Sequence, residues 1–328
     1  MKKGVIIRRI LFSVFMLLAV LAGNVAARVQ ILAENSLNLI DKTDKLDLSD
    51  SGIDESTLLQ DDKVINILLI GADKRADWTE AGRSDSMMIA TLDGKNKRLK
   101  VTSLMRDLYV DIPGHGQDRL NAAYSYGGVD LLYSTLAQNF NIKLDGYILV
   151  DFKAFKSVVN TIGGVNIEIT DWEYNYLINK YPTGSIQKLK PGMNLMNGTQ
   201  ALAYSRIRQD SSADFGRTAR QRKVIQSVFT EVKEMPLSDV YRLINDVLPY
   251  VATDQTNDDI TDLVKRVLTM GTTELDQFRI PVNGAFTDET VYKGGTKMEV
   301  LVPDLYANKS YLEDFIYNYN GGDEEYMP

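Results

Sequence analysis

Residues 66–106 read NILLIGADKRADWTEAGRSDSMMIATLDGKNKRLKVTSLMR and hold the first three strands that we predict for this 328-residue chain. The runs at 66–70, 86–92 and 99–104 are short and apolar, which is typical of strands. More strands are predicted at 146–152, 165–170, 277–281 and 298–302, and helices at 129–140, 152–162, 199–204, 218–234, 237–250 and 258–270. This alternation predicts an α/β fold in which helices sandwich a mixed central sheet.

The first predicted strand ends in Gly71 and delivers a loop that carries Asp73, Arg75, Arg83 and Asp85. Two carboxylates and two arginines suit a divalent-cation site beside a phosphate, because Mg²⁺ prefers a few carboxylate oxygens together with phosphate and water. The alternative is an ordinary loop in which each aspartate pairs with a neighbouring arginine. Two more arginines stand at the ends of predicted elements: Arg106 after the strand at 99–104, and Arg119 at the start of a helix.

Residues 204–223, YSRIRQDSSADFGRTARQRK, carry six basic and two acidic residues inside a chain of formal net charge −7. If 205–208 is extended, Arg206 and Arg208 face one side and Ile207 the other. A helix is expected after Gly216, which places Arg217, Arg220 and Gln221 in its opening turn at the positive end of the helix dipole. This pattern predicts a site for a multiply charged oxyanion such as pyrophosphate. The alternative is a solvated basic helix face.

The N-terminus predicts a membrane anchor. Basic residues at 1–9 precede an uncharged run at 10–27, whose helical length of about 27 Å is close to the ~30 Å hydrocarbon core. We expect a cytoplasmic tail at 1–9, a transmembrane signal-anchor at 10–27, an acidic stalk at 28–63, a catalytic domain at 64–319 outside the cell, and a C-terminal tail at 320–328. A cleaved signal peptide ending at Val25-Ala26-Ala27 is the alternative.

The chain has no cysteine and a single histidine, His115, which lies in a predicted turn. Thiol catalysis, disulfides, cysteine–zinc sites and histidine-based triads are therefore excluded. Catalysis by this chain has to rest on positioning and on neutralising charge, which is how phosphoryl transfer is usually accelerated.

Eight segments carry a family resemblance. They are NILLIGADKR (66–75), RSDSMMIATLD (83–93), VTSLMRDLYVDIPGHG (101–116), DRLNAAYSYGG (118–128), GYILVDFKAF (146–155), IGGVNIEI (162–169), MNGTQALAYSRIRQ (196–209) and DFGRTARQRKVI (214–225). In this order, over about residues 64–319, they closely resemble the LytR-CpsA-Psr family of Gram-positive bacteria. The predicted membrane anchor is similar to that of the family too.

The resemblance implies a phosphotransferase of cell-wall biogenesis. Such an enzyme moves a glycopolymer, for example a wall teichoic acid or capsular polysaccharide, from undecaprenyl pyrophosphate to peptidoglycan through a phosphodiester. It implies a single-pass protein of the cell membrane with an extracellular catalytic domain. It also implies a hydrophobic tunnel for the polyprenyl tail, with the helices predicted at 129–140 and 152–162 as candidate walls; ordinary core packing is the alternative for their apolar residues.

The resemblance also implies a set of site residues, matched motif by motif. Asp73 and Asp85 resemble ligands of Mg²⁺, with Mn²⁺ as an alternative metal. The implied pyrophosphate clamp consists of Arg106, Arg119, Arg206, Arg208, Arg217 and Gln221, with Arg75, Arg83 and Arg220 as further members. Of these residues, Asp73, Asp85, Arg106, Arg206 and Arg217 are the predicted catalytic ones. Some relatives have lysine where Arg119 stands.

Three other functions stay open on the sequence. The same clamp would serve an extracytoplasmic polyprenyl-pyrophosphate pyrophosphatase, in which water is the acceptor, or a polymer-binding module without turnover. A membrane-bound regulator of cell-envelope genes is the third. Nucleic acid is not expected as a partner, because the domain is acidic overall and the predicted topology places the basic stretch outside the cell.

Overall fold

The computed structural model describes residues 41–72, 84–208, 213–232, 250–270 and 275–319, together with residues 235, 243 and 246. The predicted anchor at 10–27, the loop residues Asp73, Arg75 and Arg83, and the tail at 320–328 lie outside these ranges. Within them, no helix combines the length and the apolar character needed to cross a membrane. The chain divides into two compact units, and each is described by itself: unit 1 is 1–42 with 150–273, and unit 2 is 43–149 with 274–328.

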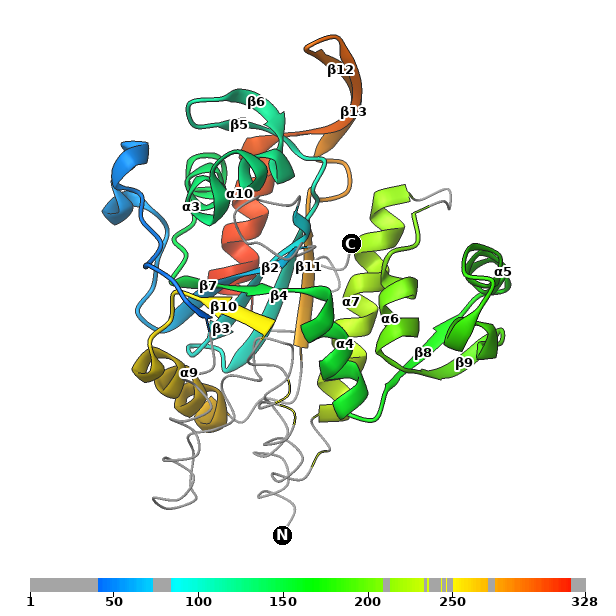
Figure 1. The fold of residues 1–328 in the computed structure, drawn as a ribbon. Helices are drawn as coiled ribbons and strands as arrows, with labels where there is room; N and C mark the ends of the chain where they lie inside the picture. Colours follow the sequence, from blue (N-terminus) through cyan, green and yellow to red (C-terminus); the bar gives the residue numbers. More distant parts are fainter. Residues whose placement is uncertain are drawn as a thin grey trace. The chain divides into compact units, whose positions relative to one another are not determined.

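A mixed sheet forms the centre of unit 2 (Figure 1). Its strands are neighbours in the order β7 (Gly146–Val150), β2 (Val64–Ala72), β3 (Ser84–Asp93), β4 (Arg98–Leu104) and β11 (Leu275–Ile280). The pairs β2–β3 and β3–β4 are antiparallel, whereas β11 runs parallel to β4. The predicted strands at 66–70, 86–92, 99–104, 146–152 and 277–281 are therefore confirmed, and so is the mixed character of the sheet.

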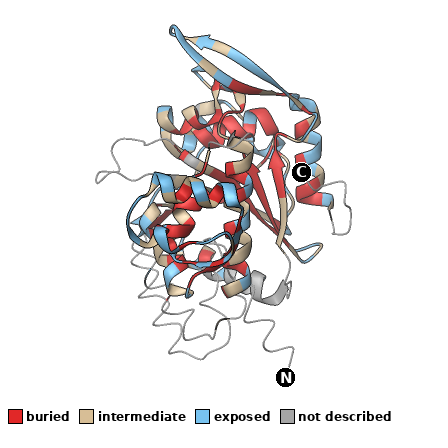
Figure 2. Ribbon diagram, turned by 90° about the vertical axis from the view of Figure 1, so that its right-hand side faces the viewer, coloured by how far each residue is buried: buried red, intermediate tan, exposed pale blue. Residues whose placement is uncertain are grey.

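The strands of this sheet are buried along most of their length, as Figure 2 shows. Ile67, Leu68 and Ile89 are fully buried, which accounts for the near-continuous apolar runs in the sequence. One buried charge is paired: Lys100 Nζ lies 2.6 Å from Asp93 Oδ2 and donates to the carbonyl of Ile316. The contact fastens the π-helical segment η7 (Asp314–Asn318) over the sheet.

The remaining elements of unit 2 surround the sheet. They are η3 (Ser49–Ser51), η4 (Glu55–Thr57), β5 (Tyr109–Ile112), β6 (Gly116–Arg119), α3 (Leu120–Phe140), β12 (Phe286–Lys293), β13 (Thr296–Pro303) and α10 (Leu305–Glu313). Strands β5 and β6 form one hairpin, and β12 and β13 form another that is largely exposed (Figure 2). Helix α3 is interrupted at Gly127 and Gly128, where Gly128 has φ 65°, so the predicted helix at 129–140 matches its second half.

Residues 43–63, which we expected to belong to the stalk, make contacts inside unit 2. Leu48 and Leu58 are buried, Leu59 forms a β-bridge with Ile142, and Glu55 accepts a 2.8 Å hydrogen bond from Tyr133 Oη. Ordered structure in unit 2 therefore starts before the strand at Val64.

Unit 1 consists of helices, a short hairpin and a pair of short parallel strands. Its elements are β1 (Asp41–Lys42), α4 (Phe152–Thr161), β8 (Val165–Ile169), α5 (Asp171–Lys180), η5 (Gly184–Lys188), β9 (Gly192–Met196), α6 (Gly198–Ser205), α7 (Ala213–Val232), β10 (Val251–Thr253) and α9 (Asn257–Met270). Strand β1 pairs parallel with β10, and β8 pairs antiparallel with β9. The start of α6 lies so close to α4 that a Cβ at Gly198 would approach the carbonyl oxygen of Lys156 to 2.4 Å, so only glycine fits.

Two local predictions in unit 1 were wrong. Helix α7 begins at Ala213 rather than after Gly216, so Arg217 lies in its second turn, beyond the strongest part of the helix dipole. Residues 205–208 are not a strand, because α6 continues to Ser205 and Arg206 takes its C-cap position with φ −104° and ψ 4°. The helix predicted at 237–250 lies mostly outside the described residues.

Candidate functional site

The end of β2 and the start of β3 meet at a β-bulge in unit 2. Gly71 pairs with Ser86 and Ala72 pairs with Ser84, so Asp85 is the extra residue of the bulge. Asp73, the other aspartate of the predicted metal site, follows Ala72 in the sequence and lies outside the described residues. A Cβ at Gly71 would lie 3.2 Å from Ser86 Cβ, which favours glycine here. Bulges are over-represented next to active sites.

A buried hydroxyl lies at the same strand end. Ser84 is fully buried, and its Oγ has no hydrogen-bond partner within the described part of the chain. A buried donor without a partner costs free energy, about 1–3 kcal/mol, unless a ligand or ion satisfies it. The bulge and this hydroxyl are two features of unit 2 that fit an ion or a phosphate oxygen, although the hydroxyls of Thr102 and Ser103 on β4 also have no partner within the described residues. The described residues contain no group of three or more histidine, cysteine or acidic side chains placed to hold a metal.

One carboxylate joins two of the predicted clamp arginines in unit 2. Asp107 is buried, and its Oδ2 lies 3.1 Å from Arg106 Nε while its Oδ1 lies 3.2 Å from Arg119 Nε. Arg106 follows β4, and Arg119 is the residue before α3. Because Asp107 carries one negative charge against two positive ones, the trio keeps a net positive charge and both guanidinium groups are oriented in advance.

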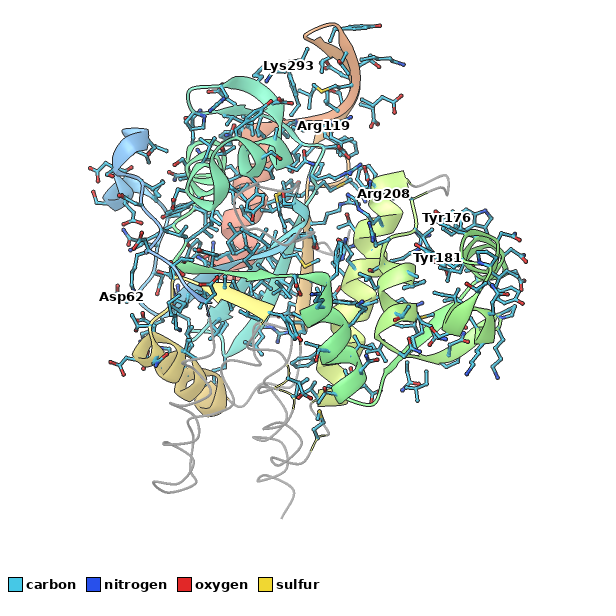
Figure 3. The ribbon with its side chains drawn as sticks, in the orientation of Figure 1. Asp62, Arg119, Tyr176, Tyr181, Arg208 and Lys293 are labelled. Carbon is cyan, nitrogen blue, oxygen red and sulfur yellow. The ribbon has the colours of Figure 1, made fainter. Side chains whose placement is uncertain are left out.

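Several contacts fasten the exposed hairpin β12–β13 beside Arg119, among them a 2.9 Å hydrogen bond from the Leu301 amide to the carbonyl of Asp107. Arg119 Nη2 donates to the main-chain carbonyl of Glu299, and Lys293 Nζ lies 2.7 Å from Asp118 Oδ2. Asp118 also accepts a 2.6 Å hydrogen bond from Tyr126 Oη. Burial acts to raise the pKa of Asp118, but the hydrogen bonds from Lys293 and Tyr126 outweigh it and hold the pKa below its ordinary value. Arg119 and Lys293 are labelled in Figure 3.

The basic stretch at 204–223 forms a turn and a helix in unit 1. After α6, Arg206 is exposed, Ile207 is fully buried, and Arg208 has 39% of its side chain exposed. The Arg206 guanidinium lies 4.8 Å from the centre of the Phe152 ring, a cation–π contact with the first residue of α4. Buried Ile207 anchors the turn, so the two flanking arginines are presented from a fixed backbone.

A second aspartate pairs with two predicted clamp arginines, now in unit 1. Asp214 Oδ1 lies 2.7 Å from Arg217 Nη1 and 3.9 Å from Arg208 Nε. Arg217 is 3% exposed, whereas Asp214 is partly exposed. One turn further along α7, Arg222 has a buried Nη1 with no hydrogen-bond partner among the residues that the structure describes, and burial lowers its pKa. Gln221 precedes it on the helix.

Arg220 has a structural contact. It is buried, its Nε lies 2.7 Å from Glu173 Oε1, and its Nη1 donates to the carbonyl of Ile207 at 3.3 Å. Glu173 also completes a capping box with Thr170 at the start of α5. Burial, followed by the charge of Glu173, raises the pKa of Tyr204 well above its ordinary value. The pair therefore connects α5 and α7 with the turn that carries Arg206 and Arg208.

The structure thus places the predicted residues in three groups. The strand-end group contains the Asp85 backbone, a second group in unit 2 contains Arg106 and Arg119, and unit 1 contains the others: Arg206, Arg208, Arg217, Arg220 and Gln221. Sequence reasoning missed Asp107, Asp214 and Glu173, the carboxylates that hold these arginines. In the sequence, Asp107 is adjacent to an arginine and Asp214 lies within one helical turn of one, and this proximity was the only signal for them. Glu173 has no arginine near it in the sequence and gave no signal.

Comparisons with known proteins show which proteins this chain resembles. The LytR_cpsA_psr family model matches residues 26–303. Polyisoprenyl-teichoic acid–peptidoglycan teichoic acid transferase TagU of Bacillus anthracis is 34% identical over 264 residues, which cover 79% of this chain and 83% of TagU. Regulatory protein MsrR of Staphylococcus aureus is 30% identical over 262 residues, 79% of this chain and 76% of MsrR.

A solved structure shares the fold. Bacillus subtilis YwtF (TagT) with bound octaprenyl pyrophosphate lipid superimposes with a TM-score of 0.59 at 22% identity, over 84% of this chain and 99% of that one. With a family model that spans most of the sequence, and relatives that are matched over most of their length, the chain belongs to the LytR_cpsA_psr family.

Proposed function

We propose that this chain is a phosphotransferase that moves an anionic glycopolymer from undecaprenyl pyrophosphate to peptidoglycan through a phosphodiester. The chain belongs to this family and has two arginine clusters, and this observation carries the proposal. Asp107 holds the arginines of one cluster, and Asp214 holds those of the other. The relative TagU is named a teichoic acid transferase, and YwtF (TagT) shares the fold and was solved with octaprenyl pyrophosphate. Both support a polyprenyl-linked donor.

The arginines supply charge and fixed donors in this reaction. Arg106 and Arg119 are oriented by Asp107, and Arg208 and Arg217 by Asp214. Planar guanidinium groups grip phosphate oxygens through two parallel hydrogen bonds, and their charge stabilises the negative charge that develops on the oxygens during transfer. Pre-orientation by aspartate lowers the ordering cost of this grip, since the side chains are already held in place.

The chemical step is a displacement at phosphorus. The oxygen of a sugar hydroxyl on peptidoglycan attacks the glycan-proximal phosphorus, the bond between that phosphorus and the bridging oxygen breaks, and undecaprenyl phosphate leaves. We assign the hydroxyl proton to a carboxylate of the strand-end group, Asp73 or Asp85. Buried Arg217, held 2.7 Å from Asp214, stabilises the charge on the phosphate oxygens.

We propose Mg²⁺, or Mn²⁺ in its place, as the metal, with Asp73 and Asp85 as its ligands. Support comes from the bulge that carries Asp85 beside the end of β2 and from the Ser84 hydroxyl without a partner in the described residues. When bound, such an ion neutralises phosphate charge. We also propose the single-pass anchor at 10–27, which puts the catalytic domain outside the cell.

The test is transfer itself. Full-length protein in detergent is incubated with an undecaprenyl-pyrophosphate glycan and uncrosslinked peptidoglycan, and mass spectrometry searches for the joined product. We expect the phosphodiester-linked product with the wild-type chain. If the polymer is released with a terminal phosphate at the same rate with and without peptidoglycan, water is the acceptor and the chain is a pyrophosphatase.

A regulator is the second candidate, because the relative MsrR is named a regulatory protein. The two functions differ in which side of the membrane the domain occupies and in turnover. A reporter fused after residue 328 shows on which side of the membrane the domain lies. Formation of the joined product shows whether the chain turns over substrate. An intracellular domain that forms no product would replace the transferase with the regulator.

A further inference from the structure

Helix α5 presents aromatic side chains to the solvent. Trp172, Tyr176 and Lys180 recur every four residues and so lie along one face of the helix. Trp172 is 42% exposed, and its ring stacks on that of Tyr176 with centroids 5.5 Å apart and 19° between the planes. Tyr176 and Tyr181 are labelled on this part of unit 1 in Figure 3. The two stacked rings form an aromatic surface that is partly open to solvent.

A cation completes this surface. Lys180 Nζ donates a 2.7 Å hydrogen bond to Tyr176 Oη and lies 5.1 Å from the centre of the Tyr176 ring and 5.9 Å from that of Tyr181. Residues 171–190, DWEYNYLINKYPTGSIQKLK, contain three exposed lysines against two acidic residues, exposed Asp171 and buried Glu173, and Glu173 is already paired with Arg220, although the whole chain has a net charge of −7. The aromatic surface is therefore locally positive, and the ligand that it favours is negatively charged.

The adjacent face of α5 is held in place by packing and an ion pair. Leu177 is fully buried, and Glu173 is paired with Arg220. At the C-terminus of the helix, Gln187 Nε2 donates to the carbonyls of Ile178 and Tyr181 at 2.9 and 2.7 Å. The aromatic face is thus fixed in advance, which reduces the entropy lost when a ligand binds to it.

We propose that Trp172, Tyr176, Lys180 and Tyr181 form a binding platform for the sugar rings of an anionic glycan chain. The C–H face of a pyranose ring is weakly positive and fits the negative face of an aromatic ring, while the ammonium and the tyrosine hydroxyls bind the carboxylates, phosphates or hydroxyls of the chain. An apolar protein partner would leave Lys180 and these hydroxyls desolvated, so it fits less well. This proposal deepens the proposed function. It rests on that function only for the source of the glycan, which is either the donor polymer or the acceptor strand of peptidoglycan.

The experiment measures binding rather than transfer. Trp78 and Trp172 are the only tryptophans in the chain, so in a Trp78→Phe background the emission of Trp172 reports on the platform alone. Full-length protein in detergent is titrated with three probes. They are peptidoglycan glycan strands freed of stem peptides, an anionic sugar-phosphate polysaccharide without lipid, and inorganic polyphosphate, which has the charge but no sugar ring.

We expect at least one of the two glycans to change the Trp172 emission, with polyphosphate bound more weakly. With the native Trp78 restored, calorimetry should show binding weakened at least about fivefold by Trp172→Ala or Tyr176→Ala, because truncating an aromatic anchor commonly costs more than 1 kcal/mol. Tyr306→Ala is the matched control, since Tyr306 is 86% exposed on α10 of unit 2. The glycan whose binding is weakened in the two platform variants identifies the natural ligand as the donor polymer or the acceptor strand.

Equal affinity of the wild type and both platform variants for both glycans would overturn the proposal, as would binding of polyphosphate that equals that of the glycans. Arg217→Lys separates this result from a failure of the proposed function. That variant should retain glycan binding at α5 even where transfer is lost, because Arg217 is paired with Asp214 on α7, whereas the platform residues lie on α5 and directly after it.

Discussion

Glu173→Ala should be among the most destabilising single changes in unit 1. Glu173 and Arg220 are both less than 10% exposed, and the atoms that pair them, Oε1 and Nε, lie 2.7 Å apart. Removing the carboxylate leaves the Arg220 charge buried and uncompensated, which typically costs about 3–5 kcal/mol. It also removes the side-chain acceptor that caps the Thr170 amide at 2.9 Å. A total stability of about 5–15 kcal/mol makes this loss easy to detect.

The assay is urea unfolding followed by tryptophan fluorescence, with Trp172 adjacent to the mutated position. Glu173→Gln keeps the shape and a carbonyl oxygen for the Thr170 amide, so its cost should be smaller than that of alanine. The matched control is Asp262→Ala, which breaks an exposed pair with Arg266 and should cost about 0–1 kcal/mol.

The double variant Glu173→Leu with Arg220→Met tests the physical reason. Removing both charges together should recover most of the stability, because the uncompensated charge disappears. If Glu173→Ala costs no more than Asp262→Ala, or if the double variant is less stable than either single one, the contact between Glu173 and Arg220 does not hold α5 and α7 in the way described.

Four further outcomes are expected. Arg217→Lys should slow transfer about ten- to a hundredfold at saturating Mg²⁺ with little change in melting temperature, because lysine keeps the charge but loses the two-pronged donor; an unchanged rate would make the basic stretch a solvated face. Asp85→Asn should weaken Mg²⁺ binding in calorimetry without unfolding the chain, and unaltered affinity would remove this ligand. The depressed pKa of Asp118 predicts stability that is complete above the ordinary aspartate pKa of about 3.9 and lost as pH falls through the lower folded value. Lys293→Met should therefore weaken the dependence of the melting temperature on pH between pH 5 and 2.5. An unchanged pH profile would show that the contact between Lys293 and Asp118 does not stabilise the hairpin. Deleting residues 1–30 should leave a soluble protein with cooperative thermal unfolding, whereas a broad, non-cooperative melt would place the domain boundary elsewhere.

The sheet could be predicted from the sequence because its strands are apolar runs bounded by charged or glycine residues. Ile67, Leu68 and Ile89 are buried whatever the order of the strands, so their positions were predictable from composition. The register of the strands could not be predicted, and neither could the bulge at Asp85, because pairing between β2 and β3 depends on contacts across an intervening loop.

The residues of the candidate site were nominated from residue types and spacing alone. Arginine spacing indicated an oxyanion site, but it did not tell an arginine that binds a ligand from one that binds the protein. Arg220 illustrates this, since its partner Glu173 is 47 residues away in sequence. The helix start was misplaced because Gly216 was interpreted as a boundary, although helix α7 tolerates a glycine in its first turn. Asp107 and Asp214 became meaningful only when their distances to two arginines were known.

The way in which Arg119 is held by the β12–β13 hairpin has a consequence for how members of this family diverge. The acceptor on the hairpin is the main-chain carbonyl of Glu299, while the side chain of Glu299 is 84% exposed. Any residue other than proline at 299 or at its strand neighbours preserves the carbonyl and its direction. The outer surface of the hairpin is therefore free to change its charge or its aromatic content between paralogues while Arg119 stays in place.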